Sequence, residues 1–217
     1  MDCCLSTLLF LSRTLDAGVV SAIAAAGIGK VELFMQRPHL DAADHDCVRA
    51  AAVILDGAGV RAVSAHMPIY TERLIDRAAR KGLSLSLSSA DRAVRDRAAA
   101  ELASAVEACR VLGVRNIVVH TGLGGDCGTD DRSVDRCVTA LKGPGRMARE
   151  LGINLALENG TEPGVTVDLL QKVLEGLDLS NAGICIDVGH SNLYGSPLED
   201  SGRGGGRVFS QHLHDND

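Results

Sequence analysis

Short apolar runs alternate with longer amphipathic stretches along most of the 217-residue chain. Apolar runs of about four to eight residues suit buried strands, whereas apolar residues spaced three and four apart indicate helices. The pattern predicts seven strands, at residues 5–11, 30–34, 60–65, 116–119, 154–157, 184–186 and 207–213. It predicts helices at residues 16–26, 47–58, 91–112, 133–151 and 167–177.

Glycine, proline and capping residues refine this pattern. Asp91 is a good N-cap for the long third helix, and the sequence Gly-Pro-Gly at 143–145 predicts an interruption of the fourth. Residues 70–89 read as a polar connection and the glycine-rich residues 122–128 as a loop. After His190 the helical periodicity fails, so we expect either a short helix at 197–201 or an irregular loop.

Strands separated by helices imply parallel pairing through right-handed crossovers, in either an open doubly wound sheet or a closed barrel. The first strand is followed by SRTLDAG, without the glycine fingerprint of a dinucleotide-binding sheet. Polar residues of ligand type instead end strand after strand, and only a barrel gathers all strand ends at one mouth. These residues are Glu32, His66, His120, Glu158, Asp187 and His212. The sequence therefore predicts an α/β fold, a (β/α)8 TIM barrel in a single domain at 1–217.

Seven strands do not close an eight-stranded barrel. The chain ends on the polar sequence HDND directly after the last predicted strand, so we expect the barrel to lack its C-terminal eighth strand. An open barrel exposes unpaired sheet edges, which predicts self-association and a possible homo-oligomer.

Composition narrows the classes of partner and compartment. A net charge of −6 and only 2% aromatic residues argue against a nucleic-acid partner. The apolar start MDCCLSTLLFL is too short to span a membrane and lacks a basic leader. The seven cysteines are scattered and never spaced as CxxC, so we interpret them as reduced core residues of a cytoplasmic protein.

Glu158, Asp187 and His212 follow three successive predicted strands and supply two carboxylates and one imidazole. Singly, each also reads as a capping acid or a surface histidine. Together they predict a site for one divalent metal ion, Mn, Mg, Co or Zn, because such ions take mixed oxygen and nitrogen ligands. The lack of thiolate partners in this set argues against a structural zinc site.

Six short motifs carry a family resemblance: VELF at 31–34, AHMP at 65–68, VVHTG at 118–122, LALENG at 155–160, IDVGH at 186–190 and HLHDND at 212–217. In this order they resemble the strand-end signatures of the xylose isomerase-like TIM barrels. That superfamily includes sugar phosphate isomerases and epimerases, ketose 3-epimerases and the endonuclease IV class of apurinic-site nucleases.

The resemblance implies a role for each matched residue. Glu158, Asp187 and His212 would bind the metal ion, with His214 able to share the face of His212. Glu158 would also act as one of two catalytic acid/base carboxylates. The substrate-binding residues would be His190, which would hold a substrate oxygen, and Glu32, His66 and His120, which would line the pocket.

The implied function is a divalent-metal-dependent isomerase or epimerase acting on a small sugar or sugar phosphate through an enediolate. The alternatives are an endonuclease IV-like apurinic-site phosphodiesterase and a non-catalytic truncated barrel.

The sequence departs from the family pattern at two places that bear on this choice. The fourth metal ligand of the family, a glutamate of the eighth strand, has no counterpart here. The additional nuclease histidine is replaced by the sequence Ser-Ser-Ala at 88–90, and the later D-x-H pair is absent.

Overall fold

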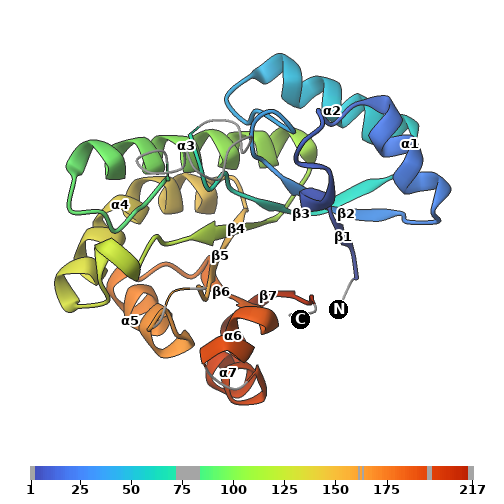
Figure 1. Ribbon diagram of the computed structural model, residues 1–217. Helices are drawn as coiled ribbons and strands as arrows, with labels where there is room; N and C mark the ends of the chain where they lie inside the picture. The colour runs from blue at the N-terminus through green and yellow to red at the C-terminus, as the bar shows by residue number, and fades with distance from the viewer. Residues whose placement is uncertain (1–2, 72–83, 161, 163, 195–196, 215–217) are drawn as a thin grey trace. The chain divides into compact units, whose positions relative to one another are not determined.

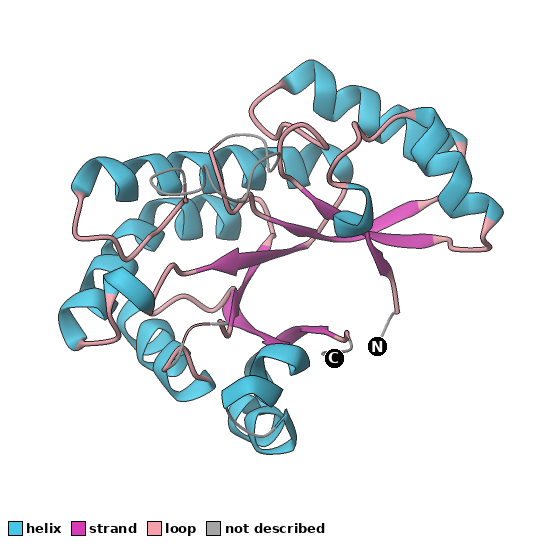
Figure 2. Cartoon of the chain, viewed as in Figure 1, coloured by secondary structure: helices cyan, strands magenta, loops and turns pink. Residues whose placement is uncertain are grey.

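The computed structural model describes residues 3–71, 84–160, 162, 164–194 and 197–214 (Figures 1 and 2). The chain divides into two compact units, one of Met1–Leu85 with Glu101–Ile117 and one of Ser86–Ala100 with Val118–Asp217. Most of the predicted polar connection at 70–89 and the last three residues of HDND lie outside the described residues. That residues 1–217 form a single domain stays a prediction.

The first unit repeats a strand and a helix. Strands β1 (Leu5–Ser6), β2 (Lys30–Phe34) and β3 (Arg61–His66) pair in parallel in that order. Helices α1 (Ala17–Ala25) and α2 (His45–Gly57) each begin after an aspartate. The carboxylates of Asp16 and Asp44 accept hydrogen bonds from amides of the first helical turn, which explains where both helices start.

The predicted first strand at 5–11 is wrong beyond its second residue. Residues Thr7–Phe10 form a 3-10 helix, η1, and Leu8 and Leu9 are 50% and 73% exposed. Two hydroxyl groups account for this turn. The Ser6 side chain accepts a hydrogen bond from the Leu8 amide, and the buried Thr7 Oγ1 accepts one from the Phe34 amide. Such local bonds compete with a continuing strand.

The second unit contains most of strand β4 (Asn116–His120) and all of strands β5 (Asn154–Glu158), β6 (Ala182–Asp187) and β7 (Val208–His212). They are neighbours in that order, and β6 pairs in parallel with both β5 and β7. Helices α4 (Asp131–Glu150) and α5 (Val167–Leu177) pack against each other and against β5 and β6. Helix α3 (Arg92–Leu112) contributes residues to both units, and the predicted loop at 122–128 contains a short 3-10 helix, η2 (Gly125–Cys127).

Helix α4 continues through Pro144, so the predicted interruption at 143–145 is wrong. A proline usually disfavours a helical residue before it, because its ring crowds the Cβ of that residue. Here that residue is Gly143, which has no Cβ. Pro144 and Gly145 lie on the buried side of the helix, where a Cβ on Gly145 would approach Leu179 to 2.6 Å. Tight packing on this side helps to keep the helix continuous.

Beyond β6 the chain is more regular than the sequence indicates. Helix α6 (Val188–Tyr194) begins directly after the strand, and α7 (Pro197–Gly204) is longer than the predicted helix at 197–201. Both helices pack against the β6–β7 part of the unit.

The cysteines and helices bear on two expectations from composition. Cys109, Cys137 and Cys185 are buried, as predicted, but Cys3 and Cys4 are exposed, so the core interpretation is wrong for that pair. Burial raises the pKa of the Cys137 thiol to about 12. Among the helices that the structure describes, none has both the length and the apolar character needed to cross a membrane.

Gly183 lets β6 and β7 approach closely. A Cβ at this position would lie 2.4 Å from the Arg207 carbonyl oxygen and 2.6 Å from the Phe209 ring. We expect Gly183→Ala to lower the free energy of unfolding by about 2 kcal/mol, because backbone cannot move aside cheaply. Urea unfolding measures this change. Gly57→Ala is the control, since nothing lies within 4 Å of that site; equal effects of both substitutions would contradict the prediction.

Candidate functional site

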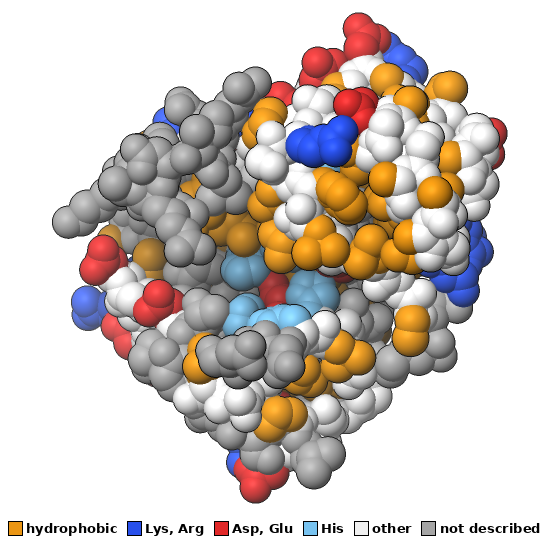
Figure 3. All heavy atoms as spheres, turned by 45° about the vertical axis from the view of Figure 1, so that its right-hand side comes forward, with side chains coloured by type: hydrophobic (Ala, Val, Ile, Leu, Met, Phe, Trp, Pro, Cys, Tyr) orange, Lys and Arg blue, Asp and Glu red, His pale blue; other side chains and the backbone are white. Residues whose placement is uncertain are grey.

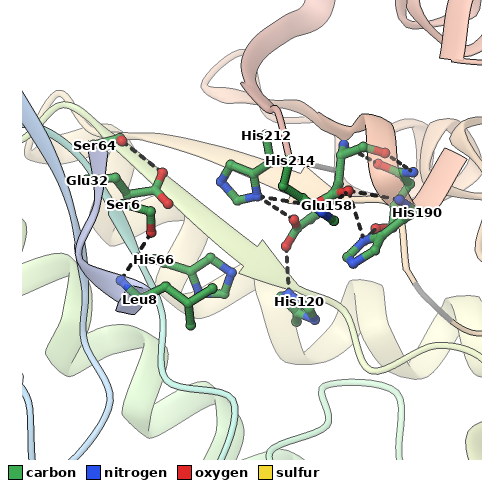
Figure 4. Close-up of polar contacts among 12 residues, drawn as sticks. Ser6, Leu8, Glu32, Ser64, His66, His120, Glu158, His190, His212 and His214 are labelled. Atoms are coloured by element: carbon green, nitrogen blue, oxygen red, sulfur yellow. Dashed lines mark hydrogen bonds and ion pairs between the residues drawn. The ribbon is translucent and has the colours of Figure 1, made fainter. Parts of the chain in front are cut away.

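Four polar side chains end the four strands of the second unit: His120 on β4, Glu158 on β5, Asp187 on β6 and His212 on β7. The parallel register pairs Glu158 with Cys185 and Asp187 with His212. Paired residues of parallel strands point to the same side of the sheet, and so do residues two apart on one strand. The two carboxylates therefore face the same side of the sheet. Figure 4 shows the Glu158 carboxylate with its contacts to His120 and His212.

Glu158 is a buried carboxylate held between two imidazoles. It is 3% exposed. Its Oε2 lies 2.6 Å from His120 Nε2, and its Oε1 lies 2.6 Å from His212 Nδ1. The carboxylate accepts from both rings, and such charge-assisted hydrogen bonds offset part of the cost of burying the charge. The His120 ring remains 28% exposed, and histidine side chains reach the surface in Figure 3.

Asp187 is also 3% exposed and has several donors. His214 Nε2 donates to its two oxygens at 2.9 and 3.1 Å, and the His190 amide donates to Oδ1 at 2.8 Å. Burial acts to raise the pKa of Asp187, but hydrogen bonds from His212 and the His190 amide, with the nearby His190 ring, bring it below its ordinary value. Because α6 starts at the next residue, Asp187 is also the N-cap of that helix.

Asn159 fixes the backbone of Asp187. Its Oδ1 accepts a hydrogen bond from the Asp187 amide at 2.7 Å, and its Nδ2 donates to the Asp187 carbonyl at 3.1 Å. Nδ2 also donates to Ser191 Oγ on α6 at 3.1 Å. The side chain is 2% exposed, so it joins the end of β5 to the β6–α6 junction from the interior.

His190 is oriented by the same segment. Its Nδ1 lies 2.8 Å from the Asn159 carbonyl oxygen and donates to it, since a carbonyl can only accept. In the neutral ring, Nε2 is then the acceptor. Its ring packs edge-on to His214 with centroids 6.0 Å apart. The position suits a group that receives a hydrogen bond from a hydroxyl or binds a cation.

Glu32 lies in the middle of β2 and His66 at the end of the neighbouring strand β3, both in the first unit. Glu32 is 3% exposed and its Oε2 accepts a hydrogen bond from Ser64 Oγ at 2.8 Å. His66 is 2% exposed, its ring stacks on Phe34 at 4.1 Å, and its Nδ1 donates to the Met67 carbonyl at 2.7 Å. Their roles in substrate binding stay predictions.

Two groups of potential metal ligands occur among the described residues of the second unit. Within each group the ligand atoms lie within 4.8 Å of one another: Glu158, Cys185 and His212 in one, and Asp187, His190 and His214 in the other. The three ligands predicted from sequence are thus divided between the groups. His212 connects them, because its Nδ1 lies 2.6 Å from Glu158 Oε1 and 3.6 Å from Asp187 Oδ2. Carboxylate oxygens and imidazole nitrogens so close together fit a divalent metal ion.

The sequence predicts no site role for Asn159 or Cys185. Asn159 follows Glu158 in LALENG, where a short polar residue after a buried strand end is an available signal. Cys185 precedes Asp187 by two residues and so shares its face. His214 stands two residues after His212 and reaches Asp187, as the same periodicity allows.

Parallel strands joined by helices, with acids and histidines at the strand ends, define a barrel-type α/β protein with a candidate metal centre. A sequence model described as the xylose isomerase-like TIM barrel matches residues 20–217. The chain therefore belongs to the xylose isomerase-like TIM barrel family, as the motifs predict. Its described residues form seven strands of this barrel and no eighth.

Solved structures of sugar epimerases share the fold. A D-tagatose 3-epimerase-like protein is 22% identical, with a TM-score of 0.81 over 100% of this chain and 77% of that one. A D-psicose 3-epimerase crystallised with D-fructose is 18% identical, with a TM-score of 0.74 over 98% of this chain and 72% of that one. The uncharacterized protein MJ1311 of Methanocaldococcus jannaschii is 29% identical over 124 residues, which are 52% of this chain and 41% of that protein.

Proposed function

We propose that this protein is a divalent-metal-dependent isomerase or epimerase that acts on a small sugar or sugar phosphate through an enediolate. The observation that carries the proposal is the buried Glu158 carboxylate, which two imidazoles hold at 2.6 Å at the end of β5. Membership of the xylose isomerase-like family and the likeness to sugar epimerase structures support it.

Glu158, Asp187 and His212 would hold one divalent ion, Mn, Mg, Co or Zn. Such an ion, when bound, polarises a carbonyl and stabilises negative charge on adjacent oxygens. His212 Nδ1 lies 2.6 Å from Glu158 Oε1 and 3.6 Å from Asp187 Oδ2, so the three predicted ligands are neighbours. His214, whose Nε2 donates a hydrogen bond to Asp187, is an alternative nitrogen ligand for the ion.

Glu158 would move the proton. One carboxylate oxygen takes the proton from the carbon beside the carbonyl, and the electron pair of that C–H bond passes into the carbonyl to give the enediolate. His120 would keep the carboxylate in place, because its Nε2 can donate a hydrogen bond to Oε2 of Glu158. The hydrogen bond from His190 Nδ1 to the Asn159 carbonyl leaves Nε2 as an acceptor. Nε2 would accept a hydrogen bond from a substrate hydroxyl.

Hydrogen exchange tests this proposal more directly than product formation, because it detects proton abstraction alone. Purified protein loaded with each divalent ion in turn is incubated with D-tagatose, D-psicose or D-fructose in D2O. We expect deuterium to enter the sugar at the carbon next to the carbonyl, as followed by NMR. Exchange that requires the added ion, and stops on chelation, supports the proposal.

Glu175→Gln is a control variant, since Glu175 is an exposed glutamate of α5 outside the candidate site. It should exchange deuterium into the sugar at the wild-type rate. The proposal is wrong if the folded wild-type protein binds no divalent ion, or if exchange with these sugars and their phosphates never exceeds the rate of the ion alone.

A further inference from the structure

Cys185 lies on the ligand side of β6. It precedes Asp187 by two residues, so both side chains point the same way from the strand. The β5–β6 register sets it opposite Glu158, and the β6–β7 register shifts between Ile184 and Cys185. The shift pairs Cys185 with Ser210 and Asp187 with His212. These pairings bring a sulfur atom to the carboxylate and imidazole at neighbouring strand ends.

The thiol is buried beneath the candidate metal centre. Cys185 is 0% exposed, and its Sγ lies within 4.8 Å of ligand atoms of Glu158 and His212. The rest of its surroundings include Val118, Ala156 and Phe209, which are apolar. A thiol with no access to solvent is a poor nucleophile, whereas thiolate sulfur, imidazole nitrogen and carboxylate oxygen are all ligands that zinc takes in proteins.

We propose that Cys185 is a sulfur ligand of the metal ion, so that the site prefers zinc or cobalt(II) to magnesium or manganese. Thiolate is a soft ligand that favours Zn²⁺ and Co²⁺, whereas sites of oxygen and nitrogen alone also suit Mg²⁺ and Mn²⁺. On binding, the S–H bond breaks, its proton passes to solvent and the sulfur keeps the electron pair for the metal. No oxidation or reduction takes place. The inference rests on the metal site of the proposed function and specifies its chemistry.

Cobalt(II) spectroscopy tests the inference without reference to turnover. A thiolate ligand gives a sulfur-to-cobalt charge-transfer band in the near ultraviolet. We expect this band in the cobalt-loaded wild-type protein and in the control Cys137→Ala, which removes another buried cysteine of the same unit. We expect the band to be absent in Cys185→Ala and in Cys185→Ser, a variant of closer volume that covers the case in which alanine disrupts folding.

Competition between metals provides the second measurement. Titration of zinc against manganese should show a preference for zinc in the wild-type protein that falls about 10- to 100-fold in Cys185→Ser. A band of equal intensity in both Cys185 variants, or an unchanged metal preference, overturns the inference. Either result would leave the proposed function intact, provided that ion-dependent deuterium exchange into the sugar is still observed. Failure of the wild-type protein to bind any divalent ion overturns both.

Discussion

Replacing Glu158 with glutamine is expected to slow ion-dependent deuterium exchange into the sugar roughly 10³-fold. The amide has nearly the same shape as the carboxylate but cannot accept the carbon-bound proton. It also presents an NH2 group to one of the two imidazoles, His120 and His212, that now donate to Glu158. NMR in D2O measures the rate, and metal titration shows how much of the loss reflects weaker binding of the ion.

Circular dichroism of Glu158→Gln should match the wild-type spectrum, because the substitution keeps the volume of the side chain. Glu175→Gln again serves as the exposed counterpart. If Glu158→Gln with a full complement of metal exchanged deuterium at the wild-type rate, Glu158 could not be the group that takes the proton.

Replacing Asn159 with alanine is expected to lower the free energy of unfolding by about 2 to 4 kcal/mol. The substitution removes the partners of the buried Asp187 amide and carbonyl and of Ser191 Oγ. Each of these groups then stays buried without its bond, which costs more than the bond itself contributes. Urea unfolding measures the change as a lower midpoint with an unaltered slope.

Asn192→Ala is the control, because Asn192 is an exposed residue of α6. It should change the free energy of unfolding by no more than about 0.5 kcal/mol. An effect of Asn159→Ala as small as that would mean that water replaces the asparagine without cost, and the link between β5 and α6 would then carry little stability.

The strands that bear the candidate site could be predicted because two signals coincide at their ends. Asn154–Glu158 and Ala182–Asp187 are largely apolar strands that end at an acid. A buried strand that ends in a polar group can be recognised from the sequence alone. The helix Val167–Leu177 was predicted to the residue, because its apolar face repeats regularly.

Other features depend on partners that a linear reading does not reveal. The first strand ends at Thr7 because the Thr7 hydroxyl accepts a hydrogen bond from the Phe34 amide, 27 residues away in the chain. Pro144 remains in a helix because the residue before it is a glycine and the buried side of the turn is tightly packed. The predicted ligands fall into two groups, and their placement depends on the register of β6 and β7, which shifts between Ile184 and Cys185 and which sequence periodicity does not specify.

The capping of α6 by Asp187 affects how related chains should be compared. A carboxylate that starts a helix is useful to folding whether or not it binds an ion, so selection for stability alone would retain an acid or an asparagine at position 187. Retention of such a residue at position 187 in a related chain is therefore no sign that an ion binds there. Glu158 is the better marker of the proposed activity, because the hydrogen bonds of that carboxylate begin no helix.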